Sequence, residues 1–469
     1  MSASMSFDVV VIGGGPGGQK AAVQACKAGA SVLLIEREAA IGGECVHRGT
    51  IPSKTLRNSA MTYLRWMSEF ERDKRGARCS SALSALIARK NRVTKTHEEY
   101  MTRQMQRNGI VTWRGHASFV SEHELCVRST DGARHIVRAE HIVIATGSRP
   151  RTPPNVVVDH ENILDSDSVL GLPYLPESLV VLGGGVIATE FASFFAALGV
   201  QVTMVDKAER PLSFLDPELT ERWIAEFERM GGRYLGRRTL RHVEFDGVSR
   251  VQTELENGEV LASEKAFCAL GRTAQVAGLD LAKAGLALSA RGTIEVDAHC
   301  RTSVESIYAV GDVIGPPALA ATSMEQGRRA VRYALGLPGL DARGAVPVGI
   351  YSIPEIATIG MSEAEVRAAH GSCVVGRARF EELARGIING DERGLLKLVC
   401  GPDGRKLLGA HILGDGATEL VHVAQIAIAT HADVDLFLES IFNFPTFAEA
   451  YLVAALDVLE QRNAKSKAA

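Results

Sequence analysis

Side chains suited to redox chemistry gather between Gly42 and Lys54. This stretch holds one thiol, at Cys45, and a hydroxyl at Thr50, where a second thiol would complete a pair. A dithiol relay needs two sulfurs within bonding distance, so Cys45 and Thr50 cannot form one. Lys54 follows Pro52 and Ser53 at the start of an expected helix, where its charge could stabilise an anionic group.

A glycine-rich turn near the N-terminus follows a run of β-branched residues. The strand expected over 7–12 leads into Gly13, Gly15 and Gly18, and a helical pattern follows over about 19–28. A second strand, expected over 31–35, ends in Glu36, which is 36 − 13 = 23 positions after the first glycine. Such glycines permit a tight turn and the approach of a pyrophosphate to a helix N-terminus, and the acid accepts from ribose hydroxyls.

The same arrangement recurs in the middle of the chain. The strand expected over 179–182 leads into Gly183, Gly185 and Ala188, and a helix follows through 198. The next strand, over 201–205, ends in Asp206, again 206 − 183 = 23 positions on. Two copies of this motif with the same glycine-to-acid spacing are a far more specific signal of dinucleotide binding than a single glycine turn. They predict two dinucleotide-binding domains, and so a bound flavin together with a nicotinamide nucleotide.

Length and composition limit the remaining possibilities. With 469 residues we expect two to four domains, and a net charge of −3 favours neither nucleic acid nor an anionic membrane as a partner. No apolar run reaches the ~18–20 residues of a membrane helix, and the N-terminus lacks a signal-type pattern, so we expect a cytoplasmic protein. The eight cysteines lack zinc-type spacing, so we expect reduced thiols and no metal site.

Further segments bear on the domain organisation. The strand expected over 142–150 contains a glycine turn at Gly147, and the one expected over 307–312 carries Asp312 at its tip. Region 55–110 has a helical period and many charged residues, most simply a solvated face. After Pro347 the pattern changes to short strands and then helices, which indicates a separate C-terminal domain.

Together these motifs resemble the flavoprotein disulfide reductases, over nearly the whole chain. The resemblance also rests on the segments 45–54, 311–315 with 326–328, 350–356 and 442–451. It implies an α/β fold with two Rossmann-like dinucleotide-binding domains, for FAD and NAD(P), and a C-terminal α+β interface domain that forms a homodimer. We expect the FAD domain in two parts, 1–152 and 274–345, the NAD(P) domain at 153–273, and the interface domain at 346–469.

The resemblance also assigns residues to the two sites. Lys54 matches a lysine near the flavin, and Glu190 matches a glutamate of the NAD(P) domain that pairs with it. The expected FAD site comprises Gly13, Gly15, Gly18, Glu36, Cys45, Lys54, Gly147, Asp312 and Ala320. The expected NAD(P) site comprises Gly183, Gly185, Ala188, Glu190, Asp206, Gly271 and Arg272.

Two residues depart from the family pattern, and both departures affect the thiol chemistry of the family. Thr50 replaces the second cysteine, and Phe444 replaces the histidine that serves as acid and base for the thiols, although Glu449 keeps its place. Thiol exchange needs a second sulfur and a proton carrier, and this chain has neither. Cys45 is then either an inert residue of the flavin pocket or a lone redox thiol that cycles through sulfenic acid.

Hydride exchange between a nicotinamide and a flavin needs neither group. We therefore expect a transhydrogenase reaction, in which hydride passes from NADPH to NAD+ through bound FAD at one nicotinamide site. Three further functions are compatible with the motifs: an NAD(P)H oxidase or a quinone- or diaphorase-type reductase, a degenerate dihydrolipoamide dehydrogenase, and a flavin-binding structural protein without turnover.

The choice of nicotinamide nucleotide depends on the second acid. Asp206 should accept from the ribose 2′-OH of NAD(H) and repel the 2′-phosphate of NADP(H). Lys207 and Arg210 could offset that repulsion or could be solvated charges. A transhydrogenase has to admit both nucleotides.

Overall fold

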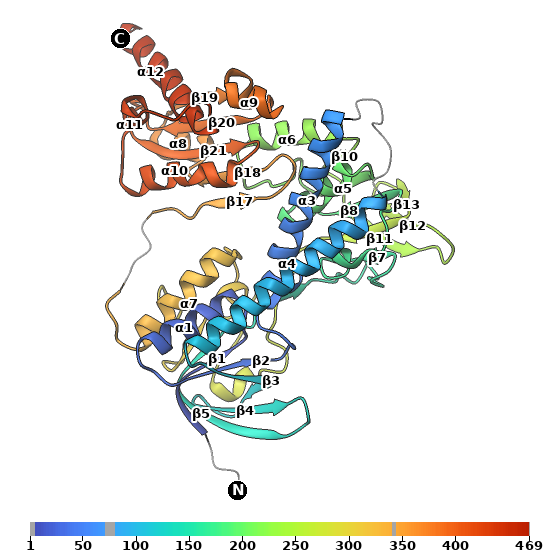
Figure 1. Ribbon diagram of the computed structural model, residues 1–469, viewed down its shortest axis with the longest axis vertical. Helices are drawn as coiled ribbons and strands as arrows, with labels where there is room; N and C mark the ends of the chain where they lie inside the picture. Colours follow the sequence, from blue (N-terminus) through green and yellow to red (C-terminus); the bar gives the residue numbers. More distant parts are fainter. Residues whose placement is uncertain (1–4, 71–79, 340–343, 469) are drawn as a thin grey trace.

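A computed structural model describes residues 5–70, 80–339 and 344–468. Its first unit lies at the bottom of Figure 1, the second at the upper right in green, and the C-terminal unit at the upper left in orange and red. Each unit has its own sheet, and the second is inserted between two stretches of the first. The α/β class with a C-terminal α+β unit is confirmed.

The first unit is built on a parallel sheet. Its strands run in the order β3 (Val111–Phe119), β2 (Val32–Glu36), β1 (Met5–Ile12), β5 (Arg134–Ile144) and β16 (Ile307–Ala309). The strand β4 (Glu124–Ser129) joins the extended ends of β3 and β5 in antiparallel pairing. Val9, Val10 and Val11 are fully buried because β1 lies inside the sheet, with apolar layers on both faces.

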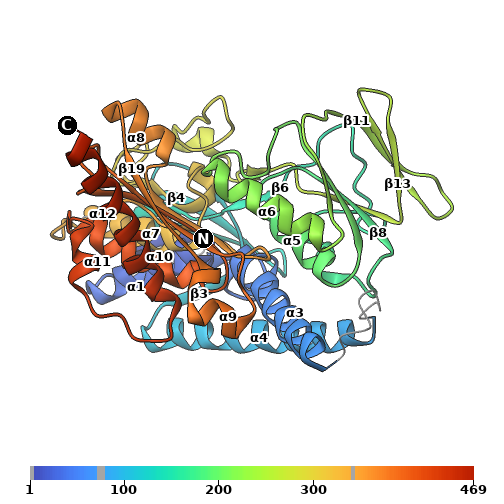
Figure 2. The same cartoon turned by 90° about the horizontal axis from the view of Figure 1, so that it is seen from above.

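Five α-helices of the described residues belong to this unit. The helices α1 (Pro16–Lys27) and α7 (Ala320–Ala334) pack on each other so tightly that a Cβ on Gly327 would lie 2.1 Å from the carbonyl oxygen of Gly17. The helices α3 (Thr50–Phe70) and α4 (Ser80–Arg107) lie side by side (Figure 2). They confirm the expected helical pattern over 55–70 and 80–107, while 71–79 lie outside the described residues. The short α2 (Gly43–His47) precedes α3 and carries Cys45.

The second unit repeats the parallel arrangement. Its strands run β10 (Arg233–Leu235), β9 (Gln201–Val205), β8 (Ser178–Leu182), β14 (Lys265–Cys268) and β7 (Ile163–Leu164). The helices α5 (Val186–Ala197) and α6 (Pro217–Arg229) belong to it, as does a meander of β11 (Leu240–Phe245), β12 (Val251–Leu255) and β13 (Val260–Ser263). Where the chain enters and leaves this unit, β6 (Ser148–Pro150) pairs with β15 (Arg272–Ala274).

The C-terminal unit is an antiparallel sheet covered by helices. Its order is β17 (Val348–Ile350), β18 (Ile356–Gly360), β21 (Leu407–Leu413), β20 (Leu395–Cys400) and β19 (Val374–Arg379). Its helices are α8 (Glu363–His370), α9 (Ala384–Asn389), α10 (Ala417–Ala429), α11 (Asp435–Glu439) and α12 (Ala450–Ala468). Tyr451, Ala454 and Val458 anchor α12 and are fully buried.

Short 3-10 segments complete the chain at Val169–Gly171, Leu281–Ala284, Gly311–Ile314, Phe380–Glu382 and Phe447–Glu449. Within the described ranges, no helix is long and apolar enough to cross a membrane.

Candidate active site

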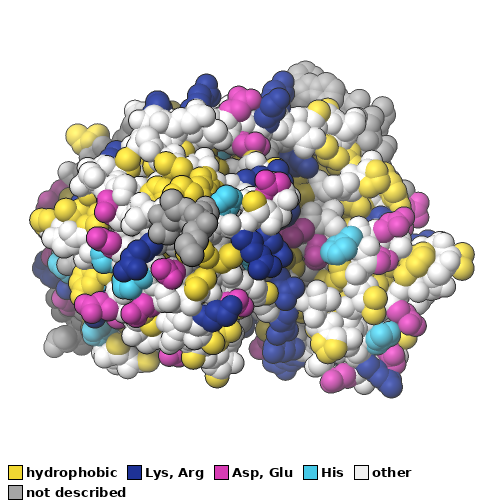
Figure 3. Space-filling model, turned by 90° about the horizontal axis from the view of Figure 1, so that it is seen from below, with side chains coloured by type: hydrophobic (Ala, Val, Ile, Leu, Met, Phe, Trp, Pro, Cys, Tyr) yellow, Lys and Arg dark blue, Asp and Glu magenta, His cyan; other side chains and the backbone are white. Residues whose placement is uncertain are grey.

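A cavity of about 1760 Å³ runs between the three units. Of the residues expected at the two sites, all but Gly18 and Ala188 line it. Its basic lining residues are Arg37, Arg48, Lys54, Arg151, Lys207, Arg238 and Arg272. Figure 3 shows a furrow between two lobes, with Lys and Arg side chains along it. Its acidic lining residues are Glu36, Glu38, Glu44, Glu98, Glu190, Asp206 and Asp312, so charges of both signs line it. The size suits extended ligands such as dinucleotides.

The first glycine turn brings the N-terminus of α1 to the cavity. Gly13 has φ +104°, and a Cβ there would lie 2.4 Å from the carbonyl oxygen of Ala145. Gly15 precedes α1, and among the described residues only Gly43 comes within 4.0 Å of a Cβ built on it, so the backbone N–H groups stay accessible. A Cβ on Gly18 would lie 1.9 Å from the oxygen of Gly13. Gly18 therefore lets the helix pack on its strand and does not face the cavity.

Glu36 lies at the cavity end of β2. Its Oε2 accepts from the backbone N–H of Gly14 at 2.7 Å, and its Oε1 accepts from Glu38 at 2.9 Å. These bonds fix the carboxylate at the edge of the cavity, where its remaining lone pairs can accept ribose hydroxyls. An accessible helix N-terminus and a fixed acid are the features that a dinucleotide such as FAD requires, so the residues fit FAD.

The second glycine turn has the same geometry. Gly183 has φ +113°, and no atom of the described residues lies within 4 Å of a Cβ built on Gly185, which precedes α5. Ala188 is fully buried and takes the packing position of Gly18 in the first turn. Asp206 follows β9, and its Oδ1 accepts from the backbone N–H of Ala208 at 2.6 Å.

An ion pair joins the two dinucleotide units inside the cavity. Lys54 Nζ, on α3, lies 2.9 Å from Oε1 and 2.7 Å from Oε2 of Glu190, on α5. The Lys54 side chain is 26% exposed and that of Glu190 is 9% exposed. The C-terminal unit adds Tyr351, whose backbone N–H donates to Glu190 Oε1 at 2.9 Å and whose ring centroid lies 5.0 Å from Nζ. The pair therefore lies where all three units meet.

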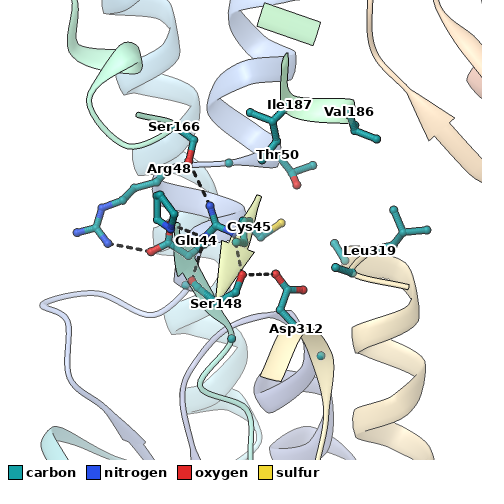
Figure 4. A pocket seen from close by; sticks show the side chains of 18 of the residues that line it. Glu44, Cys45, Arg48, Thr50, Ser148, Ser166, Val186, Ile187, Asp312 and Leu319 are labelled. Carbon is teal, nitrogen blue, oxygen red and sulfur yellow. Dashed lines mark hydrogen bonds and ion pairs between the residues drawn. The ribbon is translucent and has the colours of Figure 1, made fainter. Parts of the chain in front are cut away.

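Cys45 and Thr50 are in contact, as the spacing of a redox pair requires. The Thr50 side chain hydrogen-bonds the sulfur, and Figure 4 shows both side chains at the pocket. Burial raises the pKa of Cys45, against the lowering effects of Thr50 and Lys54. The thiol thus stays protonated near neutral pH, which suits a lining residue better than a nucleophile.

Arg272 was expected at the NAD(P) site, but its guanidinium is occupied by neighbouring side chains. It donates to Ser148 Oγ at 2.7 Å, to the Ser148 carbonyl oxygen at 2.9 Å and to Ser166 Oγ at 3.2 Å. It also lies 3.6 Å from Glu44. Ser148 Oγ in turn donates to Asp312 Oδ2 at 2.6 Å (Figure 4). Arg272 therefore lines the cavity and, through these contacts, connects the first and second units.

The remaining expected residues lie as follows. Gly147, Gly271, Asp312 and Ala320 all line the cavity, and Ala320 begins α7. Phe444 is 67% exposed and is absent from the lining of its own chain's cavity.

Three further lining residues, Ser148, Tyr351 and Arg238, were not expected from the sequence. Tyr351 lies in the segment 350–356, which supported the family resemblance but suggested no site residue. Arg238 follows β10, which pairs parallel to β9. Recognising β10 would have placed Arg238 at the sheet edge that carries Asp206.

Two dinucleotide folds around a shared cavity, with a C-terminal antiparallel domain, define a class of pyridine nucleotide-dependent flavoprotein oxidoreductases. Residues 7–327 match the family model for pyridine nucleotide-disulphide oxidoreductase, and residues 346–455 match its dimerisation domain. The chain belongs to the pyridine nucleotide-disulphide oxidoreductase family.

Particular relatives are similar over almost the full length. The soluble pyridine nucleotide transhydrogenase of Mycobacterium tuberculosis is 43% identical over 463 residues, which are 98% of each chain. That of Vibrio atlanticus is 37% identical over 467 residues, covering 98% of this chain and 100% of the relative. Among solved structures, LpdA of Mycobacterium tuberculosis has a TM-score of 0.88 at 25% identity. The HOCl-induced flavoprotein disulfide reductase RclA of Escherichia coli has 0.87 at 27%, and both alignments cover 96% of this chain and 99% of that chain.

Proposed function

We propose that this protein is an FAD-dependent transhydrogenase that moves hydride between NADPH and NAD+. The observation that carries the proposal is the Lys54–Glu190 pair, held at 2.7 Å in a cavity where Cys45 faces a hydroxyl. The cavity has a glycine turn and an acid for each of two dinucleotides, whereas the second sulfur of a thiol relay is missing. The full-length similarity to relatives named soluble pyridine nucleotide transhydrogenase supports the same reaction.

Residues of the first unit would hold FAD. The N-terminus of α1 would face the pyrophosphate through the turn at Gly13 and Gly15, Glu36 would accept from the ribose, and Asp312 lines the same cavity. FAD, when bound, supplies a ring that takes hydride from one nicotinamide and returns it to another. Lys54 would supply a positive charge to that ring, and Glu190, which accepts from Lys54 and from the Tyr351 backbone, would hold the ammonium in place.

Residues of the second unit would hold either nicotinamide nucleotide in turn. Gly183 and Gly185 would let the N-terminus of α5 approach the pyrophosphate, and Asp206 would accept from the adenosine ribose. The sequence contains one such unit beside the FAD unit, so NADPH has to leave before NAD+ enters. The proposal therefore includes a ping-pong order.

The proposal extends to organisation. We assign an FAD domain to 1–152 and 274–345, an NAD(P) domain to 153–273, and an interface domain to 346–469. The dimerisation-domain match at 346–455 supports a homodimer, and exposed apolar residues on that domain, including Ile426, Ile441 and Phe444, support its use as the contact surface. We place the protein in the cytoplasm.

An anaerobic assay separates this function from an oxidase or a quinone reductase. Purified protein with its FAD is mixed with NADPH and thio-NAD+, and formation of reduced thio-NAD is followed by absorbance. We expect sustained turnover and parallel lines in double-reciprocal plots. Absent transfer together with rapid turnover on oxygen or a quinone would replace the transhydrogenase by those activities.

A second assay separates the transhydrogenase from a dihydrolipoamide dehydrogenase and from a flavin-binding protein without turnover. Dihydrolipoamide as reductant should give no turnover, and activity with it would restore the dehydrogenase. NADPH alone should bleach the flavin absorbance, and a persistent spectrum would favour a protein without turnover.

A further inference from the structure

A transhydrogenase site with an acid at Asp206 faces a conflict between its two substrates. The carboxylate suits the 2′-OH of NAD(H), but the 2′-phosphate of NADP(H) would lie beside a like charge. Asp206 Oδ1 is occupied by the backbone N–H of Ala208, and Oδ2 accepts no hydrogen bond from any residue that the structure describes. Something else in the cavity has to favour the phosphate.

The backbone places Arg238 beside this acid. The strand β10 pairs parallel to β9, and Asp206 and Arg238 both follow the carboxyl ends of these strands. The backbone N–H of Arg238 donates to the Asp206 carbonyl oxygen at 3.0 Å. Asp206, Lys207 and Arg238 all line the cavity, so two basic residues and one acid lie on neighbouring stretches of backbone at its wall.

The Arg238 guanidinium is little used within the chain. Its side chain is 41% exposed, and its nearest acid is Glu259, 3.9 Å from Nε, too far for a hydrogen bond. Nε itself is buried without a hydrogen-bond partner among the described residues. No ion pair links Arg238 to Asp206 among the contacts that the structure describes. The guanidinium therefore retains donors for a ligand.

Two neighbouring arginines lie outside the cavity lining, and Arg237 also has a close acid partner. Arg210, like Arg238, has a buried Nε without a hydrogen-bond partner among the described residues. Arg237 lies 2.7 Å from Glu209, and Arg210 lies 3.6 Å from Glu221. Neither lines the cavity. Arg210, which the sequence suggested as a phosphate contact, is thus turned to α6, and Arg237 provides a matched control of the same residue type.

We propose that Arg238 is the residue that admits NADP(H): its guanidinium binds the 2′-phosphate, with Lys207 as a second cation. Asp206 serves the 2′-OH when NAD(H) occupies the same site. A planar guanidinium forms paired, charge-assisted bonds with a phosphate, which a neutral ribose hydroxyl cannot match. The inference rests on the proposed function in that both nucleotides must enter one site.

The test compares Arg238→Ala with Arg237→Ala. Anaerobic bleaching of the bound FAD is followed at rising NADPH and, separately, rising NADH. We expect Arg238→Ala to raise the Kd for NADPH by about ten- to hundredfold and to leave that for NADH within about twofold. Arg237→Ala should change neither Kd. Equal losses for both nucleotides, or no loss, would overturn the assignment.

Competition by fragments tests the phosphate directly. In the wild type, adenosine 2′,5′-bisphosphate should inhibit NADH-driven bleaching more strongly than adenosine 5′-phosphate, and Arg238→Ala should abolish the difference. A wild type without that preference would overturn the inference. Asp206→Ala should raise NADPH use relative to NADH, and an unchanged ratio would remove that role for Asp206.

These readouts stop at the first half-reaction. Failure of hydride transfer to thio-NAD+ would contradict the proposed function and would leave the test of Arg238 intact. Conversely, normal transfer with an Arg238→Ala Kd like that of the wild type would contradict only the role of Arg238.

Discussion

The Lys54 ammonium bonds both carboxylate oxygens of Glu190, at 2.9 and 2.7 Å, across 136 positions of sequence. The two residues belong to different units, and the backbone of Tyr351 from a third unit closes the cluster. The pair itself needs the two dinucleotide units, and the hydrogen bond from Tyr351 adds the third. The position of the Lys54 ammonium in the cavity therefore depends on how the two dinucleotide units are placed relative to each other.

Lys54→Met should slow reduction of the bound FAD by NADPH by about ten- to hundredfold, because one charge-assisted interaction is lost. Glu190→Gln keeps the shape and should slow it less. Stopped-flow bleaching of flavin absorbance measures the rate, and FAD content per chain shows whether the cofactor is retained. A wild-type rate in a Lys54→Met protein with full FAD would contradict the role.

Cys45→Ser should leave hydride transfer within about twofold of the wild type. Burial raises the pKa of this thiol, so it stays protonated at neutral pH and offers little thiolate for chemistry. Alkylation of Cys45 by iodoacetamide, followed by mass spectrometry, should accordingly be slow at pH 7 and still rise above pH 9. A tenfold loss of turnover in Cys45→Ser, with full FAD, would instead favour a lone redox thiol.

Local patterns were enough to predict the two dinucleotide units. Glycines at 13 and 183 with acids 23 positions on encode a strand, a turn and a helix within one short stretch, and the structure has those elements. The continuous apolar runs of β1 and β8 likewise predict, from local sequence alone, that these strands are buried. Gly18 and Ala188 are absent from the cavity lining, because a Cβ on Gly18 would meet the backbone of Gly13 and because Ala188 is fully buried.

Local sequence patterns could not predict the contacts between segments that are distant in the sequence. Arg272 bonds Ser148 because β6 and β15 pair where the chain crosses between units, 124 positions apart in sequence. Arg238 lies beside Asp206 only through the pairing of β10 with β9. The Lys54–Glu190 pair was expected from family resemblance, since neither residue has a local signature that distinguishes it from a solvated charge.

A homodimer should have twice the chain mass of 50.2 kDa in light scattering. Ile426 and Ile441 on the interface domain are 65% and 101% exposed in the single chain, so a partner would cover apolar surface there. The double substitution Ile426→Glu with Ile441→Glu should shift the mass toward that of one chain. Val248→Glu, at an 84% exposed position of the second unit, is the control and should not. An unchanged mass in the double variant would place the contact elsewhere.

Lys397→Met should destabilise the contact between the second and C-terminal units. The ammonium is 3% exposed and lies 2.9 Å from Asp216, 3.2 Å from Glu218 and 2.8 Å from Glu363. Removing it leaves these acids without their shared cation, at a cost of roughly 3–5 kcal/mol. Lys283→Met, where an exposed pair with Asp280 is lost, should cost less than about 1 kcal/mol. Calorimetric Tm values of both variants measure the difference.

Acid should weaken the same contact. Burial alone would raise the pKa of Glu363, but hydrogen bonds from Lys397 and Arg367 outweigh it and lower the pKa to about 2 from 4.5. A carboxyl with a lower pKa in the folded state binds fewer protons there than when unfolded, so its stabilisation is complete above about pH 4.5 and is lost as pH falls toward 2. The Tm should therefore fall between pH 5 and 3, and less steeply in Glu363→Gln. Equal slopes in the two proteins would show that another group causes the acid sensitivity.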